Sequence, residues 1–164
     1  MLSHTAQGWL HFMAAAIALL LGAVQLLRPK GSTVHRRLGY AYIVVLLACD
    51  FGALSVYQFN GRFNALHVGA ILSALCVVAG VVPFYVSPRP QRWRVHHAMW
   101  ICWSYIGIWA AGLTELTVPT VHWSSRSQVI GATVAVTATV TCIGWLLMNR
   151  LRFQLLRHEA RTAT

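Results

Sequence analysis

The amino-acid sequence predicts an all-α fold: an integral membrane bundle of five transmembrane helices, with the N-terminus outside and the C-terminus inside. The first observation is composition, because 57% of the 164 residues are hydrophobic and only 13 Lys and Arg and 3 Asp and Glu are present. The second is that long apolar runs separate these few charges. The third is that the basic residues are concentrated in alternate connections between the runs. This combination is typical of a membrane domain and excludes a soluble globular domain.

Five apolar runs define the expected spans. Each is long enough to cross about 30 Å of hydrocarbon at about 1.5 Å per helical residue. The runs cover residues 8–28, 34–58, 62–86, 95–118 and 127–149, and a basic tail covers residues 150–164. The breaks between them read "RPKGST", "NGR", "SPRPQR" and "VPTVHWSSRS", which are turn-forming sequences. We therefore expect residues 1–164 to form a single membrane domain.

The distribution of Lys and Arg gives the expected orientation. Eleven of the 13 basic residues lie in the first connection, the third connection and the C-terminal tail. The second and fourth connections hold only Arg62 and Arg126. Because connections rich in Lys and Arg stay on the cytoplasmic side, this split predicts N-out and C-in. The net charge of +10 then reflects membrane topology, with the lipid bilayer and not nucleic acid as partner.

Small residues recur at every fourth position in the fifth run. They form two series, Gly131, Ala135 and Thr139, and Thr133, Thr137 and Thr141. Small side chains at this spacing allow two membrane helices to approach closely. We expect this span to pack against another helix of the same chain, with a homo-oligomer interface as the alternative.

The four cysteines are expected to be apolar side chains and not disulfides. They are Cys49, Cys76, Cys102 and Cys142, each in a different apolar run. None forms a C-x-x-C pair. Thiols within a membrane span mostly pack as small apolar groups.

Four histidines fall into two layers near the ends of the first four spans. The outer layer holds His11 and His67 of spans one and three, and the inner layer holds His35 and His97 of spans two and four. In an up-down bundle alternate spans lie diagonally, so two histidines of one layer can both ligate a haem b between the helices. Each span also has a glycine 11 to 17 residues beyond its histidine, at the depth of the opposite layer: Gly22, Gly52, Gly80 and Gly112. This pattern predicts transmembrane electron transfer through two haem groups.

The stretch "WRVHHAMWICWSY" contains two adjacent histidines at the start of the fourth span. Neighbouring helical residues differ by about 100° around the axis, so only one of the two histidines can face the core. His97 shares a stripe with Ser104 and Ile108, whereas His96 shares one with Trp100. We expect His97 to be the inner-layer residue and His96 to lie at the interface.

A metal site at the outer face is the alternative. Two of the three acidic residues, Asp50 and Glu115, lie inside apolar runs, where a carboxylate is costly and usually functional. Together with His11 and His67 they would suit a zinc ion with a bound water, and such a site could be hydrolytic. A structural membrane subunit without chemistry is the third reading.

The alternation of histidines resembles the dihaem cytochromes b that are reduced by ascorbate. In that family four helices carry four histidines that alternate between two haem layers. The resemblance covers spans one to four and concerns positions only. It implies haem ligation by His11, His67, His35 and His97, and electron transport with a redox partner that the sequence does not identify.

Three longer stretches resemble an uncharacterised bacterial family of multi-pass membrane proteins of unknown function. They read "HFMAAAIALLLGAVQL", "HRRLGYAY" and "HHAMWICWSYIGIWAAGLTE". The resemblance covers most of the chain and implies a multi-pass protein of the bacterial inner membrane. In the last stretch His97, Trp100 and Ser104 are among the matched positions, which favours His97 over His96.

Overall fold

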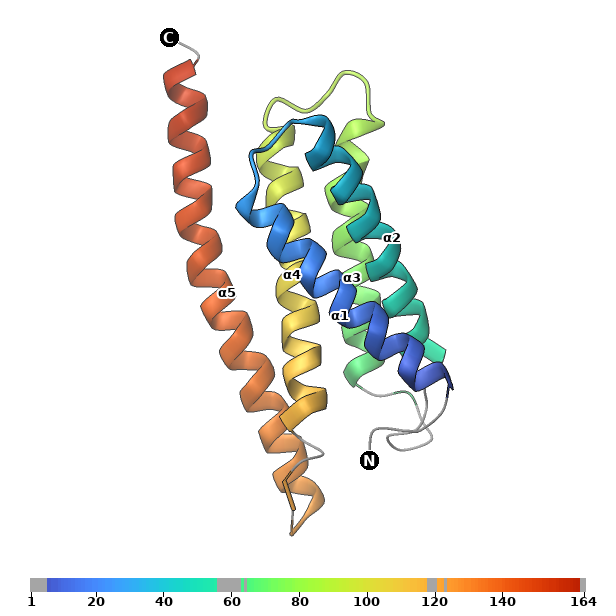
Figure 1. Cartoon of the computed structure of the whole chain (residues 1–164). Helices are drawn as coiled ribbons and strands as arrows, with labels where there is room; N and C mark the ends of the chain where they lie inside the picture. Colours follow the sequence, from blue (N-terminus) through green and yellow to red (C-terminus); the bar gives the residue numbers. More distant parts are fainter. Residues whose placement is uncertain (1–5, 56–62, 64, 118–120, 123, 163–164) are drawn as a thin grey trace. The chain divides into compact units, whose positions relative to one another are not determined.

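The computed structural model describes residues 6–55, 63, 65–117, 121–122 and 124–162, with side chains described up to residue 153. Within this part of the chain every regular element is helical (Figure 1). The elements are α1 (Ala6–Leu27), α2 (Thr33–Ser55), α3 (Ala65–Val81), the 3-10 turn η1 (Val82–Phe84), α4 (Trp93–Thr117) and α5 (Arg126–Thr162). The predicted all-α fold is confirmed. The predicted ends of spans two and three, at residues 56–58 and 62, lie outside the described residues.

Four helical segments of the described chain are long and apolar enough to cross a membrane. They are α1, α2, α3 with η1, and α5 as far as Phe153. The 25-residue α4 measures about 37 Å but is not among them. Its sequence contains four Trp, two His and one Glu, which lower its mean hydropathy. The count of five spans therefore depends on α4.

Contacts divide the chain into two compact units, Met1–Ala74 and Leu75–Thr164. In the first unit, α1 and α2 form an antiparallel pair whose turn is held by its own side chains (Figure 1). Lys30 Nζ donates three hydrogen bonds of 2.7–2.9 Å to carbonyl oxygens at and just beyond the end of α1. Gly31 has a φ of 84°, a left-handed conformation that suits glycine. Ser32 Oγ then accepts the backbone N–H of His35 at 3.1 Å and caps α2.

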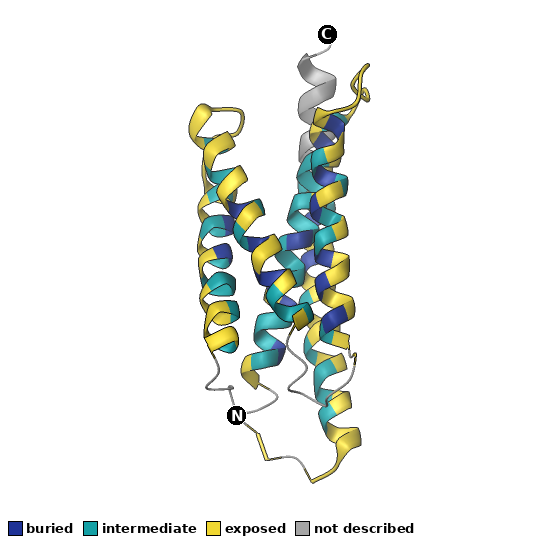
Figure 2. Cartoon of the chain, turned by 90° about the vertical axis from the view of Figure 1, so that its right-hand side faces the viewer, coloured by how far each residue is buried: buried dark blue, intermediate teal, exposed yellow. Residues whose placement is uncertain are grey.

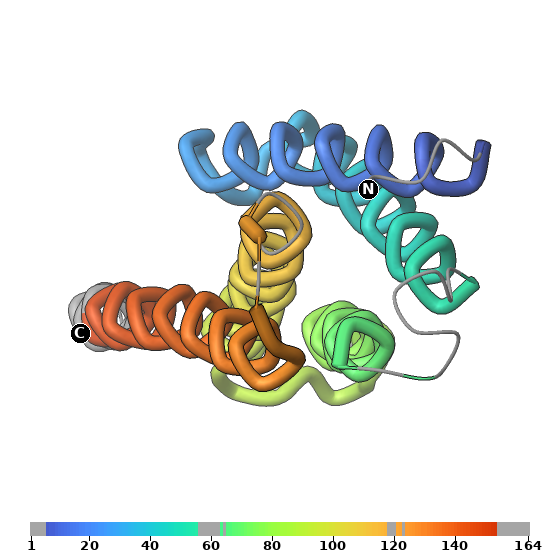
Figure 3. Tube along the Cα trace, turned by 90° about the horizontal axis from the view of Figure 1, so that it is seen from below, coloured from blue at the N-terminus to red at the C-terminus, as the bar shows by residue number. Residues whose placement is uncertain are grey.

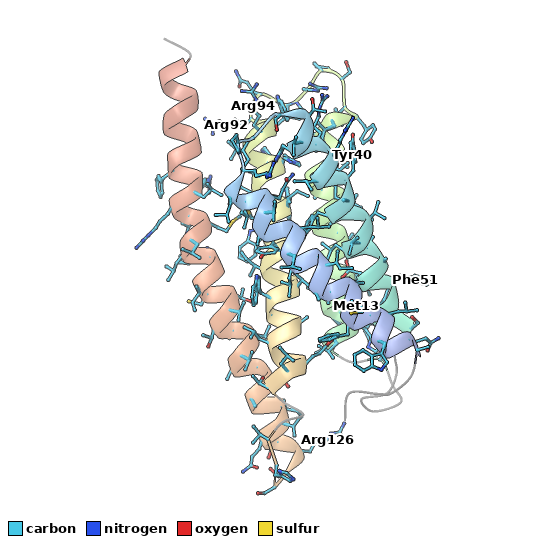
Figure 4. The ribbon with its side chains drawn as sticks, viewed as in Figure 1. Met13, Tyr40, Phe51, Arg92, Arg94 and Arg126 are labelled. Carbon is cyan, nitrogen blue, oxygen red and sulfur yellow. The ribbon has the colours of Figure 1, made fainter. Side chains whose placement is uncertain are left out.

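The inner faces of α1 and α2 are lined by small, aliphatic and aromatic residues. The buried residues are Ala18 and Gly22 of α1, and Tyr42, Leu46, Cys49 and Asp50 of α2. Figure 2 shows these buried positions on one side of each helix and exposed positions on the other. Met13 and Phe51, labelled in Figure 4, belong to the exposed faces. Exposed apolar faces are expected for helices surrounded by lipid.

In the second unit α4 packs against α5 (Figure 3). Gly144 of α5 is a point of close approach, since an added Cβ would lie 2.6 Å from Ile106 Cδ1 of α4. Further along the pair, Thr114 Oγ1 and Thr137 Oγ1 lie 3.5 Å apart. A glycine at such a crossing lets the two backbones come together without a gap.

The small-residue series of α5 differ in their surroundings. Thr137, from the second series, meets α4 as expected. Gly131, Ala135 and Thr139 are exposed, and an added Cβ at Gly131 would meet nothing within 4 Å among the described residues. Gly144 is the glycine of α5 that lies against α4, so packing of the first series within the chain stays a prediction. A homo-oligomer interface on the exposed series stays a prediction.

The segment predicted as a basic tail is helical as far as Thr162. Residues 150–162 continue α5 as a helix without interruption. The segment "NRLRFQLLRHEART" contains neither Gly nor Pro, so nothing in the sequence stops the helix.

None of the four cysteines forms a disulfide.

Candidate functional site

His11 of α1 is held by the main chain of α2. Its Nδ1 lies 3.0 Å from the carbonyl oxygen of Cys49 and 3.6 Å from Cys49 Sγ. A carbonyl oxygen only accepts hydrogen bonds, so Nδ1 of His11 carries the hydrogen and donates it. In a neutral imidazole the lone pair is then on Nε2, the nitrogen that can act as a base or a ligand.

Gly52 of α2 makes room for this imidazole. An added Cβ at Gly52 would lie 3.5 Å from both Cβ and Nδ1 of His11. The sequence placed Gly52 at the depth of His11, and the two residues are neighbours in the structure. The atoms nearest to an added Cβ at Gly52 all belong to His11.

Asp50 follows Cys49 on α2 and is 8% exposed. The polar groups that act on its carboxyl are the Ser73 hydroxyl of α3 and the His11 imidazole. The Ser73 hydroxyl is near this carboxyl but makes no hydrogen bond of good geometry with it. Neither Asp50 Oδ2 nor Ser73 Oγ has a hydrogen-bond partner among the described residues. The predicted proximity of Asp50 and His11 is therefore found, and Ser73 joins them from a third helix.

His67 of α3 is enclosed by protein, with 1% of its surface exposed. Its ring centroid lies 5.1 Å from that of Phe63, with the ring planes inclined by 33°. His67, Ala70 and Ser73 are all buried residues of α3. His67 lies about 9 Å along the helix axis from Ser73 and about 120° from it around the helix. Its predicted approach to His11 stays a prediction.

The remaining member of the predicted metal site is Glu115, which is half-buried near the end of α4 in the second unit. Its convergence with Asp50, His11 and His67 also stays a prediction. Across the residues that the structure describes, no three His, Cys, Asp or Glu side chains are grouped closely enough to hold a metal ion.

His97 of α4 repeats the arrangement of His11. Its Nδ1 lies 2.9 Å from the carbonyl oxygen of Gly80, near the end of α3. Because the acceptor is again a carbonyl, Nδ1 is the donor and the lone pair of the neutral ring is on Nε2. The edge of Phe84 packs on the imidazole, with ring centroids 4.9 Å apart and planes at 79°. Gly80 allows this approach, since an added Cβ would lie 2.9 Å from Ile101 Cδ1.

The two adjacent histidines face in the predicted directions. His97 is half-buried, and Ser104 and Ile108 on its stripe are buried. His96 is exposed, as is Trp100 on its stripe. The difference in burial between His97 and His96 agrees with the expected sorting by helix face, whereas the role of His97 as an inner-layer residue stays a prediction.

The other histidines have more varied positions. His35 is half-buried at the start of α2, and its carbonyl oxygen accepts a 2.7 Å hydrogen bond from Gln25 Nε2. It belongs to the first unit and His97 to the second, so their pairing stays a prediction. His122 is exposed. His4 and the side chain of His158 lie outside the described residues.

Sequence reasoning did not find the groups that hold the histidines. The acceptors are backbone carbonyls of Cys49 and Gly80, which leave no mark in a side-chain pattern. Ser73 was also missed, because a spacing of six turns it about 120° from His67 around the helix and marks no shared face.

Comparison with known proteins places most of these residues within one family. Residues 8–153 match the model of a family described as Predicted membrane protein (DUF2306). The chain belongs to this family. The DUF2306 match includes the predicted site residues His11, His35, Asp50, His67, His97 and Glu115, and leaves out His4 and His158. It confirms the resemblance to a membrane family of unknown function.

Beyond DUF2306, no curated protein and no solved structure matches the chain. The resemblance to dihaem cytochromes b is not supported by these comparisons. The chemistry of the DUF2306 chain therefore has to be argued from its own residues.

Proposed function

We propose that all five α-helices cross the membrane, with the N-terminus outside and the C-terminus inside. If α4 did not cross, its two flanking connections would share one side, and the basic C-terminal segment would lie opposite the basic third connection. That arrangement contradicts the preference of Arg for the cytoplasmic side. Arg92 and Arg94 lie at one end of the α4–α5 pair and Arg126 at the other (Figure 4), which supports a crossing.

Reporter fusions test this topology. Alkaline phosphatase, which requires an oxidising compartment, is expected to be inactive when fused after Thr164 and active when fused after His122. A green fluorescent protein should give the reverse result at the two positions. Phosphatase activity after Thr164 with none after His122 would reverse the orientation or remove α4 from the spans, and equal activity at both sites would show that α5 does not cross.

We infer that the chain is a membrane-embedded, haem b-binding electron-transfer protein of the bacterial inner membrane. In this proposal His11 and His67 hold an outer haem, and His35 and His97 hold an inner haem. The supporting observation is the shared anchoring of two imidazoles: His11 and His97 each donate Nδ1–H to a backbone carbonyl of the paired helix. Histidines that ligate metals usually donate their second ring nitrogen in this way, which fixes the orientation of the ring.

The residues around the histidines fit such a role. The carbonyls of Cys49 and Gly80 hold each ring and select the tautomer with its lone pair on Nε2. His67 is buried and packs against Phe63, so its imidazole is shielded from solvent. When bound, haem b would supply a reversible one-electron couple.

The metal alternative has one observation in its favour. Asp50 is a buried carboxylate in a membrane helix, influenced by His11 and Ser73, and intramembrane carboxylates are functional candidates by default. A zinc site of His11, Asp50, His67 and Glu115 would place this carboxylate beside the metal. The haem proposal is preferred because the anchored imidazoles include His97, which the metal site does not use.

The absorption spectrum of the purified full chain distinguishes these proposals. We expect a Soret band that shifts on reduction with dithionite, with about two haem groups per chain. A colourless protein with stoichiometric zinc, lost in His67→Ala, would replace haem by the metal site. A chain that binds neither group would overturn both, and would favour a structural membrane subunit.

A further inference from the structure

A cluster of three arginines and one tryptophan marks the start of α4. The guanidinium carbons of Arg89 and Arg94 each lie 5.4 Å from the centre of the Trp93 ring. Arg92 precedes Trp93, and all three arginines are exposed while the tryptophan is half-buried. These four residues are called the arginine–tryptophan cluster below. A cation–π contact orients a guanidinium but leaves its charge and its N–H donors available to a further partner.

The tryptophan of the cluster is fixed from beneath. Phe84 packs edge-on against Trp93, with ring centroids 5.2 Å apart and planes at 70°. Phe84 in turn contacts His97 at 4.9 Å. The backbone N–H of Trp93 donates to the carbonyl of Pro90 at 3.1 Å. The two guanidinium groups are therefore held on a rigid aromatic base, which reduces the conformational entropy lost when they bind an anion.

The acidic residue of α4 lies far from the arginine–tryptophan cluster. The chain has only three acidic residues. Asp50 belongs to the first unit, and the side chain of Glu159 is outside the described residues. Glu115 lies 21 residues beyond Arg94 on α4, about 31 Å along the helix. The cluster is thus a concentration of positive charge that lacks a counter-ion from its own helix.

Apolar surface adjoins this charge. Tyr85 is 79% exposed, and Val82 and Val86 are 46% and 44% exposed. They lie in η1 and directly after it, on the segment that leads from α3 toward the cluster. Positive charge beside exposed apolar side chains complements an amphiphile with an anionic head and a hydrocarbon tail.

We propose that the arginine–tryptophan cluster binds the phosphodiester headgroup of an anionic phospholipid of the phosphatidylglycerol class, with acyl chains against Val82 and Tyr85. Guanidinium groups match phosphate oxygens with paired N–H donors, which an ammonium cannot do. Lipid is the favoured source of this phosphate because the site adjoins membrane-crossing helices and includes an apolar part that a free phosphate would not use. The proposal is independent of haem or metal binding.

Spin-labelled lipids test the site in membranes that contain the full chain. The fraction of motionally restricted phosphatidylglycerol label is compared with that of phosphatidylcholine label. The test variant is Arg89→Gln/Arg94→Gln, and the matched control is Arg150→Gln/Arg152→Gln, which removes the same charge from another basic segment. We expect the preference for phosphatidylglycerol to fall about fivefold per arginine removed from the cluster. The control should keep the preference of the wild type.

Two further measurements complete the test. A lysine variant separates the shape of the guanidinium group from its charge, and competition with inorganic phosphate separates lipid from free phosphate as the ligand. Arg89→Lys/Arg94→Lys keeps the charge and is expected to lose part of the preference, because lysine lacks the planar fork. Inorganic phosphate should displace the label no better than chloride at equal ionic strength. Displacement by phosphate alone would overturn the lipid assignment. Equal loss of the phosphatidylglycerol preference in the two glutamine variants would also overturn the assignment, since general surface charge would then explain the preference. The absence of any such preference in the wild type would overturn it as well.

Discussion

His97→Ala is expected to remove one of two haem groups and to leave the outer one, whereas His96→Ala leaves both. The reason is that His97 is half-buried and anchored to Gly80, and His96 is exposed. The haem content of the purified variants, measured as the pyridine haemochrome, checks this result. Reduced-minus-oxidised spectra should also lose the signal of one haem only.

The neighbouring variant controls for the loss of structure. Both substitutions remove an imidazole from the first turns of α4, so general damage to that helix would lower haem content in each. His97→Ala also removes a hydrogen bond between α3 and α4, worth about 1 kcal/mol, and its helicity should be measured in parallel. Equal haem content in the wild type and a folded His97→Ala protein would show that His97 is not a ligand.

Gly144→Val should loosen the contact between α4 and α5 and destabilise the second unit by about 1–3 kcal/mol. An added Cβ at this position would lie 2.6–2.8 Å from Ile106 side-chain atoms. Isoleucine is branched at Cβ and has few alternative rotamers, so it cannot easily move aside. Denaturation in mixed micelles, followed by the loss of α4–α5 proximity between two fluorescent labels, measures the change.

Gly131→Val is the matched control for this substitution. It lies on the same helix and has nothing within 4 Å of an added Cβ among the described atoms. The intrinsic cost of valine in a helix is therefore similar, and only the steric term differs. Adding Ile106→Ala to Gly144→Val should recover part of the lost stability. If both glycine variants unfold alike, the close approach at Gly144 does not stabilise the pair.

Some features could be predicted because local chemistry decides them. The turn after α1 was predicted from the sequence "RPKGST", and its Lys30, Gly31 and Ser32 lie between the two helices. The interior position of His97 followed from the 100° rotation between helical neighbours. Ser104, seven residues further on, confirms that stripe by its complete burial.

Other features depend on how helices rotate against each other, which a single sequence leaves open. Gly131 and Gly144 are both glycines of an apolar helix, but only Gly144 meets a side chain of α4. The carbonyl anchors of the histidines depend on the same rotation, since every residue has a carbonyl. The low mean hydropathy of α4 has a different cause. Its four Trp side chains are large and mostly apolar, but they score low on the hydropathy scale by which membrane spans are recognised.

The length of α5 has a consequence for how far its charge acts. The helix continues to Thr162, beyond its apolar stretch, which ends at Phe153. These last residues add about 14 Å along the axis, more than the Debye length of about 8 Å at physiological ionic strength. Positions 150 and 152 lie before the end of the apolar stretch, whereas positions 157 and 161 lie about 6 and 12 Å beyond it along the axis. A soluble anionic macromolecule that approached along the axis would meet the helix end before the headgroups, and its capture rate would fall with added salt whatever the lipid composition.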